Sequence, residues 1–431
     1  MIKWFSGLLL ALLLAGCVST GMSGDSLDEI AADYVQMQLE IGEREPGYVD
    51  AYYGPAEWQA AAKAAPRSVE QLAAEAASLT ARANAVDPAG LEPLEQRRRA
   101  FLLAQLRAAE TRLRMLGGEK LSFADEAEGL FGVRPQLQEL SAYDPVLARI
   151  ERLVPGTGTL AERMDAFQNR FTIPKDRLQP VFDAAIAECK RRTLQHIALP
   201  PGEKFTMEFV TGKSWSGYNW YKGNATSLIQ INTDLPIRIS RAVDLGCHEG
   251  YPGHHVYNML LEQRLAKERG WVEYTLYPLY SPQSLIAEGS ANYGIDLAFP
   301  GEERLRYETA ALYPLAGLPA ARAGDYLALL EAMRDLTGAR FTIARDYLEG
   351  RIDRAQAVAL TQKYQLVSKA RAEQSIDFTE QYRSYVINYG LGQDMVRAYV
   401  EAAGPDPRAR WARMEKLLSE PTLPSDLLVQ P

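Results

Sequence analysis

Apolar residues recur at helical spacing along most of the chain. Between Leu94 and Leu116 they follow at steps of three and four residues, which places them on one face of an α-helix that Gly117-Gly118 ends. The residues on this face are Leu102, Leu106, Ala109, Leu113 and Leu116. Helices are also predicted from a cap at Ser26 to about Glu43, over 68–85 and over 179–195. We therefore expect residues 27–200 to form an N-terminal helical half.

The pattern changes after Leu199-Pro200-Pro201-Gly202. Apolar and polar residues alternate over 205–210, which is typical of a strand with one buried face, and Ser227–Asn232 predicts a second strand. The segment 215–223 between them is rich in glycine and aromatic residues and is expected to be a loop. Helical patterns resume at Pro236 and continue to about Ala403, before a C-terminal tail over 404–431. The predicted fold is mainly α, with a small antiparallel β-sheet in the second half, residues 201–403.

The first residues resemble an export signal. One charge, Lys3, precedes an apolar run that is too short to span a bilayer, and small residues then lead to Cys17. The string Leu-Ala-Gly-Cys at 14–17 is similar to a bacterial lipobox, which predicts a signal peptide over 1–16, lipidation of Cys17 and a tether over 17–26. The resemblance implies a cell-envelope protein held at the membrane by lipid, at the outer membrane and facing the periplasm.

Composition and charge narrow the class of protein. Of the 431 residues, 47% are hydrophobic and 24% are charged, which is ordinary for a globular protein. The net charge of −8, without a long basic run, argues against nucleic acid as a partner. Besides Cys17 the chain has two cysteines, Cys189 and Cys247, which either pair in an oxidising compartment or stay as buried thiols.

Three of the four histidines lie in one run of eight residues, His-Glu-Gly-Tyr-Pro-Gly-His-His at 248–255. Two neutral imidazoles can bind zinc, and a glutamate beside the first can take a proton from the attacking water. These residue types predict a zinc hydrolase in which His248 is a ligand and Glu249 is the general base. The run would lie between two helices, because apolar residues flank it on both sides.

The spacing in this run does not fit a regular helix. The usual second histidine at i+4 is replaced by Pro252, which is flanked by Gly250 and Gly253. On an unbroken helix His254 would point about 240° away from His248, and His255 would lie about 10 Å along the axis. A shared metal therefore requires a local bulge in the backbone.

The run resembles the His-Glu-x-x-Pro-Gly-His-His signature of a bacterial family of unknown function in the zincin (gluzincin) clan of peptidases. That family is similar to Taq-type carboxypeptidases and to peptidases of the thimet-oligopeptidase and angiotensin-converting-enzyme types. Several relatives carry Gly-His after the glutamate and a Tyr three residues further on, as in Gly253-His254 and Tyr257 here. The resemblance implies that His254 is the second ligand and that His255 contacts another ligand or the substrate; His255 remains the alternative ligand.

The resemblance also implies a third ligand on a later helix. Residues 287–293, Ala-Glu-Gly-Ser-Ala-Asn-Tyr, are similar to the family's Glu-Gly-x-Ala-x-Tyr element, and Ser281-Pro282 is a suitable helix start. Glu288 is therefore the expected third ligand, and Glu262 and Glu273 are alternatives without that context. The predicted cofactor is one Zn²⁺ per chain, although these ligands also suit other divalent metals.

Two further site residues are expected from the resemblance. The strand Ser227–Asn232 would correspond to the substrate-edge strand of related peptidases, with Asn232 contacting the substrate. Tyr389, in a segment similar to the family's Tyr-x-x-Gly element, would donate a hydrogen bond to the tetrahedral oxyanion, with Tyr382 and Tyr385 as alternatives.

Together these features predict a zinc-dependent peptidase that acts on a peptide or small amide and is held at the membrane by a lipid. Two alternatives remain open: a metal amidase that does not cleave peptides, and a catalytically silent lipoprotein that binds peptides or a partner. Neither the substrate, nor exo- against endopeptidase action, nor the oligomeric state follows from the sequence.

Overall fold

The computed structural model describes residues 26–428. The predicted signal peptide, Cys17 and, apart from Ser26, the tether lie outside the described residues. The first part of the chain is helical, and Ser26 caps the first helix with a capping box, as its position predicts. Its helices are α1 (Leu27–Arg44), α2 (Ala56–Ala64), α3 (Val69–Ala85), α4 (Pro93–Leu116) and α5 (Phe123–Phe131), followed by α6 (Asp144–Leu153), α7 (Leu160–Gln168) and α8 (Leu178–Thr193).

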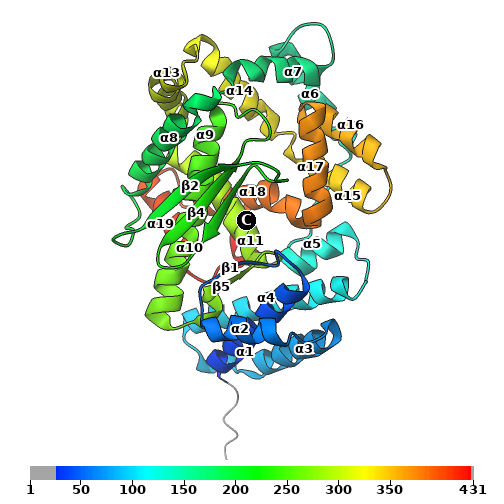
Figure 1. The fold of residues 1–431 in the computed structure, drawn as a ribbon, viewed down its shortest axis with the longest axis vertical. Coiled ribbons are helices and arrows are strands. Elements are labelled where there is room, and N and C mark those ends of the chain that lie inside the picture. Colours follow the sequence, from blue (N-terminus) through cyan, green and yellow to red (C-terminus); the bar gives the residue numbers. More distant parts are fainter. Residues whose placement is uncertain (1–25, 429–431) are drawn as a thin grey trace, which may run out of the picture.

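The apolar face of α4 is buried, as its spacing predicts. Leu102, Leu106, Ala109 and Leu113 are at most 1% exposed. Helices α1, α3 and α4 pack on one another, and Figure 1 shows α1–α5 gathered at the lower end of the molecule. Burial of one apolar stripe per helix is what holds such a layer of helices together.

Within residues 26–428, five short strands form two small sheets. Their bounds are β1 (Val49–Tyr52), β2 (Lys204–Val210), β3 (Gly217–Tyr221), β4 (Thr226–Asn232) and β5 (Leu276–Pro278). Strands β1 and β5 pair antiparallel, and the larger sheet has the order β2-β4-β3. In the larger sheet β4 is parallel to β2 and antiparallel to β3, so this sheet is mixed and the expectation of an antiparallel sheet holds for only one of its two strand pairs.

The strand β3 occupies part of the segment expected to be a loop. Alternate residues of β3, Asn219 and Tyr221, are buried, so the segment has the burial pattern of a strand. Glycine and tryptophan hide this alternation in the sequence, and the pairing with β4 fixes it.

The segment from α9 to α19 is mainly helical, as predicted, but β5 interrupts it. Figure 1 shows the larger sheet on one side of α11 and α18, and α15–α17 on the other side. The helices are α9 (Ser240–Leu245), α10 (His254–Leu261), α11 (Pro282–Ala298), α12 (Glu303–Tyr307), α13 (Tyr313–Ala316), α14 (Ala323–Arg334), α15 (Thr337–Leu348), α16 (Arg354–Gln365), α17 (Lys369–Tyr382), α18 (Ile387–Glu401) and α19 (Pro407–Ser419).

Helices α11 and α18 cross at a contact between two glycines. A Cβ built on Gly289 would lie 2.4 Å from the carbonyl oxygen of Gly392, so only glycine fits at this crossing. The close approach brings the start of α18, with Tyr389, next to the turn of α11 that carries Glu288.

The chain beyond residue 403 packs back onto the helical body. Helix α19 lies against α10, α11 and α18, and its Trp411 is buried. Helix α8, from the first half, also packs against α9 of the second half. The boundaries of the two halves stay a prediction. Between residues 26 and 428 no helix has the length and hydrophobicity needed to cross a membrane.

Candidate metal centre

The histidine run lies at a break between two helices. Helix α9 ends at Leu245 and continues as a π-helical turn, Gly246–Gly250, and α10 begins only at His254. Between them Tyr251–Gly253 leave helical geometry, and the N–H of Gly253 donates to the carbonyl of Cys247 (3.0 Å). This is the bulge that the Pro252 spacing predicts. It turns the start of α10 back toward His248.

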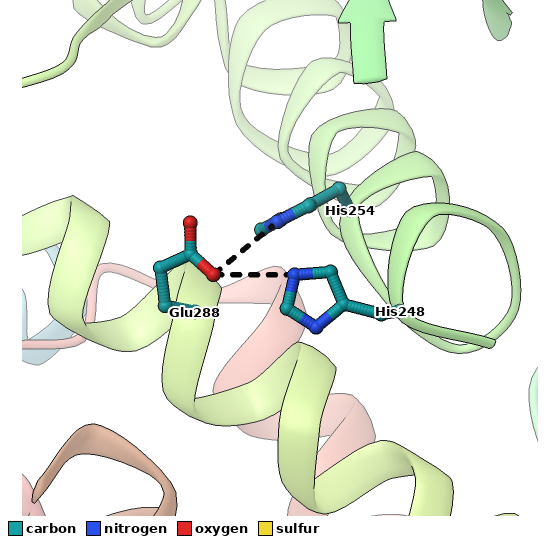
Figure 2. A group of neighbouring side chains, drawn as sticks. All are labelled: His248, His254 and Glu288. Carbon is teal, nitrogen blue, oxygen red and sulfur yellow. Dashed lines mark ion pairs between the residues drawn. The ribbon is translucent and has the colours of Figure 1, made fainter. Parts of the chain in front are cut away.

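Three predicted ligands come together across this turn. Figure 2 shows the side chains of His248 and His254 pointing at one carboxylate oxygen of Glu288, which comes from α11. The Nε2 atoms of His248 and His254 lie 3.2 Å and 3.7 Å from this Oε2 atom. One ligand atom from each residue lies within 4.8 Å of the others.

Neighbouring side chains hold two of these three residues in place. Asn292 Oδ1 lies 3.0 Å from Nδ1 of His248, and the amide group of Asn292 donates to the carbonyl of Tyr389 (3.0 Å). Because that carbonyl can only accept, Asn292 Oδ1 is left to accept from Nδ1–H of His248, which leaves Nε2 free as a ligand atom. The hydroxyl of Tyr385 donates to Oε1 of Glu288 (2.8 Å), which keeps the second oxygen, Oε2, directed at the imidazoles.

The charges of these groups shift their pKa values. Burial raises the pKa of Glu288, but His254 and His248 beside it hold that pKa well below its usual range. Burial lowers the pKa of His254, yet the carboxylates of Glu288, Glu249 and Asp50 raise it to about 9. The carboxylates of this centre thus favour a positive charge between them.

His255 does not join this cluster. Its ring is fully buried, with Nδ1 2.8 Å from the hydroxyl of Ser227 and Nε2 3.0 Å from Oε2 of Glu203. The order Ser-His-Glu is that of a hydrolase triad, but Ser227 is 1% exposed, so no substrate reaches its hydroxyl. Instead, His255 belongs to a buried polar network beneath the metal-facing turn.

Glu249 faces the same cleft as the three ligands. Gly217 of β3 lies against it, since a Cβ there would be 2.8 Å from Oε1 of Glu249. Burial is the largest cause that raises the pKa of Glu249, with Glu288 adding to it and the two histidines opposing. A buried carboxylate next to a metal site has the position and the basicity of a general base.

The cleft has a volume of about 440 Å³. It is lined by β3, by the helices that carry the histidines and Glu288, and by α15, α17 and α18. Asp50 of β1 also lines it, and the hydroxyl of Tyr218 donates to its carboxylate. Burial raises the pKa of Asp50 to about 6. Asp50 is not predicted as a site residue from the sequence, because its place depends on the pairing of its strand with β5 from the other half of the chain.

The predicted tyrosine lies in the cleft, and the predicted asparagine does not. The ring of Tyr389 stacks near the ring of His248, with 6.4 Å between centroids, and Tyr382 and Tyr385 line the same cleft. Asn232, by contrast, is held by the carbonyls of Lys213 and Trp215 and does not line it. It lines a smaller adjoining cavity together with Ser216 and Arg241, which also line the cleft, and its contact with the substrate stays a prediction.

The expectation for the substrate-edge strand is wrong in one respect. Strand β4 is paired on both sides, so it cannot add a peptide strand. The strand that borders the cleft is β3, an edge of the sheet, with Gly217–Asn219 lining the cavity.

The two alternative third ligands are engaged elsewhere. Glu262 accepts hydrogen bonds from the backbone of Asn224 (2.7 Å) and from Tyr221. Glu273 forms a buried ion pair with Arg98, with 2.6 Å between Oε1 and Nε. Neither carboxylate belongs to the group formed by His248, His254 and Glu288.

The two cysteines left open by the sequence are joined. Cys189 of α8 and Cys247, the residue before His248, form a disulfide bond. This bond joins α8 to the π-helical turn, against which α8 also packs.

Comparison with known proteins supports the fold alone. No protein-family model matches the chain, and no curated protein matches it. A solved structure described as "the putative lipoprotein from Colwellia psychrerythraea" is similar at 15% identity and a TM-score of 0.51. The match covers 84% of this chain and 66% of the Colwellia chain, so this chain spans less than two thirds of that protein's length.

Two more distant structures match with lower scores. An M32 carboxypeptidase from Deinococcus radiodurans R1 matches at 14% identity and a TM-score of 0.36, covering 90% of this chain and 88% of that one. A lipoprotein of unknown function from Shewanella oneidensis, also described as "putative", matches at 13% identity and a TM-score of 0.41, covering 86% of this chain and 74% of that one.

Proposed function

We propose that this protein is a zinc-dependent peptidase of the bacterial cell envelope. The observation that carries the proposal is the convergence of His248, His254 and Glu288 in one cleft with Glu249 beside them. Two imidazoles and a carboxylate form the three-ligand set of catalytic zinc sites, which keep one position open for water or substrate.

The donor atoms fit a metal ion. Oε2 of Glu288 is buried and finds no hydrogen-bond partner in the described part of the chain, whereas Oε1 accepts from Tyr385. Ligand atoms about 2.1 Å from one tetrahedral ion lie roughly 3.4 Å apart, close to the 3.2 Å and 3.7 Å between Glu288 and the two histidines. When bound, zinc supplies a Lewis acid that polarises the substrate carbonyl and lowers the pKa of a water molecule.

The residues of the chain would carry the proton transfers. Glu249 accepts a proton from the attacking water as the new C–O bond forms, and then gives it to the leaving amine nitrogen as the C–N bond breaks. The hydroxyl of Tyr389, whose ring stacks near that of His248, donates to the oxyanion of the tetrahedral intermediate. Asn292 holds the ring of His248 throughout, through its hydrogen bond to Nδ1.

An extended peptide suits the shape of the cleft. Strand β3 presents an edge to the cavity, and a peptide can add to such an edge through main-chain hydrogen bonds. The absence of a Cβ at Gly217 leaves room for Glu249 next to this edge. These features favour a peptide as the substrate, because a small amide has no extended main chain that could pair with β3.

The envelope location rests on two features. The lipobox-like string predicts that Cys17 carries a lipid, and the disulfide between Cys189 and Cys247 is typical of an oxidising compartment such as the periplasm. We propose that the protein faces the periplasm from the outer membrane.

A mixed peptide library tests the function. The zinc-loaded protein is expected to cleave peptides, and Glu249→Gln is expected to keep the zinc while losing roughly 10²–10⁴-fold in turnover. Cleavage of acylated amines without cleavage of peptides would indicate a metal amidase. Equal binding of peptides by both proteins, with no turnover in either, would indicate a binding protein.

A further inference from the structure

One arginine in the cleft has no ionic or hydrogen-bond partner among the residues that the structure describes. Arg340, in the first turn of α15, lines the cavity, and its Nε atom is buried without a hydrogen-bond acceptor. Within residues 26–428 its guanidinium makes no ion pair and no hydrogen bond; it only faces the rings of Phe378 (5.2 Å) and Tyr389 (5.7 Å). Arg340 is half-buried, and a buried polar N–H without an acceptor is costly, so an anion in the cleft would complete this site.

The other arginines of the cleft are already engaged. Arg371 donates to the carbonyl of Pro236 (2.6 Å), and Arg241 lies 3.4 Å from a carboxylate oxygen of Asp244. Arg340 is therefore the cationic side chain in this cleft, among the described residues, whose N–H groups are all free to take a ligand.

Arg340 lies close to the candidate metal centre. The Tyr389 ring that it faces also stacks near His248, and the charge of Glu288 acts on the guanidinium. The guanidinium faces these two aromatic rings, and a guanidinium can bind a carboxylate through two parallel hydrogen bonds. A carboxylate held by Arg340 would thus lie a short distance from the carbonyl that is cleaved.

We propose that Arg340 binds the free α-carboxylate of a peptide, so that the protein removes residues from the carboxyl terminus. This assignment rests on the proposed peptidase function. An α-carboxylate is separated from the preceding peptide carbonyl by only the nitrogen and Cα of one residue. Arg340 suits this short separation, because it faces the ring of Tyr389 and this ring also stacks near His248. All three residues line the cleft of about 440 Å³.

Binding tests the assignment without relying on turnover. The probes are one peptide with a free carboxyl terminus, the same peptide amidated, and an amidated peptide whose last residue is glutamate. In calorimetry with zinc-loaded Glu249→Gln protein, we expect the free acid to bind roughly tenfold to hundredfold more tightly than its amide. Adding Arg340→Gln should remove this preference while the zinc content stays the same, and Arg340→Lys should restore part of it.

The remaining outcomes would overturn the assignment. It is wrong if Arg340→Gln keeps the preference, if Arg371→Gln alone removes it, or if the glutamate side chain of the amide replaces the terminal carboxylate. Arg351→Gln, at an exposed and paired arginine beyond the end of α15, is the matched control and should keep the preference. Turnover separates the two proposals: a preference for the acid without cleavage of any peptide would refute the peptidase but not the carboxylate site.

Discussion

Gly253 lies directly against the backbone of His248: a Cβ built on Gly253 would be 1.8 Å from the carbonyl oxygen of His248 and 2.6 Å from that of Cys247. No side chain fits in this space, and the atoms it would meet belong to the backbone, which cannot move without moving His248. The contact closes the turn that brings His254 to the side of His248. The glycine is thus a requirement of the bulge, as Pro252 is its cause.

Gly253→Ala is expected to open this turn. Stability should fall by about 1–3 kcal/mol or more, and zinc binding should be lost, because His254 moves away from Glu288. Urea unfolding and zinc content measure the two effects. Gly250→Ala is the control in the same turn, since its Cβ would meet only the ring of Phe205, at 3.3 Å. Normal zinc content in Gly253→Ala would show that the turn does not depend on this contact.

Substitutions of His254 and His255, made one at a time, distinguish the metal ligand from the neighbouring histidine. His254→Gln should lose zinc, whereas His255→Gln should retain about one zinc per chain. Because His255 is buried between Ser227 and Glu203, His255→Gln should instead lower the free energy of unfolding by about 1–3 kcal/mol. Loss of zinc only in the His255 variant would show that His255, and not His254, is the metal ligand.

Tyr385→Phe tests the support of the third ligand. Removal of the hydroxyl leaves Oε1 of Glu288 without its donor, and zinc affinity should fall roughly tenfold to hundredfold. Competition for zinc with a chelator of known affinity measures the zinc affinity of the variant. Tyr347→Phe, which removes a hydroxyl bonded to Glu380 at the surface, should leave zinc affinity unchanged. Equal affinities in the two variants would mean that Tyr385 does not position Glu288.

Tyr389→Phe should affect turnover and spare the metal. If its hydroxyl stabilises the oxyanion, kcat should fall roughly 10²–10³-fold while zinc content and KM change little. Steady-state kinetics on a cleaved library peptide gives both constants. An unchanged kcat would leave the Tyr389 ring as a packing partner of His248 and Arg340.

The buried network around His255 should make the free energy of unfolding depend on pH in the acid range. Burial alone would raise the pKa of Glu203, but hydrogen bonds from His255, Lys190 and Tyr251 lower it to about 2. Since the folded pKa is below the unfolded one, the ionised Glu203 stabilises the fold above about pH 4.5, and this contribution is lost as the pH falls toward 2.

Urea unfolding of the parent and Glu203→Gln at about pH 7 and pH 3 measures this contribution. The parent should be the more stable protein at pH 7, and the difference should shrink at pH 3. Glu302→Gln, at an exposed position, should show no such change. A difference that is the same at both pH values would mean that Glu203 is not held ionised by its partners.

The sequence predicts well what local spacing determines. The stripe on α4, the cap at Ser26, strands β2 and β4 and the bulge at Pro252 follow from residues near one another in the chain. Glu288 was found 40 positions from His248 only through a resemblance. Its place next to the histidines depends on the packing of α11 against the π-helical turn and α10.

What the sequence missed depends on contacts between distant segments. Asp50 reaches the cleft because β1 pairs with β5, more than 200 residues later. Strand β3 is a strand because β4 pairs with it, although its composition is typical of a loop. Arg340 stands in an ordinary helical sequence, and nothing local shows that its guanidinium faces a cleft without a counter-ion.

The zinc content of the protein tests whether His248 belongs to a metal centre. The protein is stripped of metal, exposed to excess zinc, passed through a desalting column and assayed by elemental analysis beside a His248→Ala variant prepared in the same way. We expect about one zinc per chain in the parent and little in the variant. No retained zinc in the parent, or equal zinc in both proteins, would contradict the metal centre and with it the proposed peptidase.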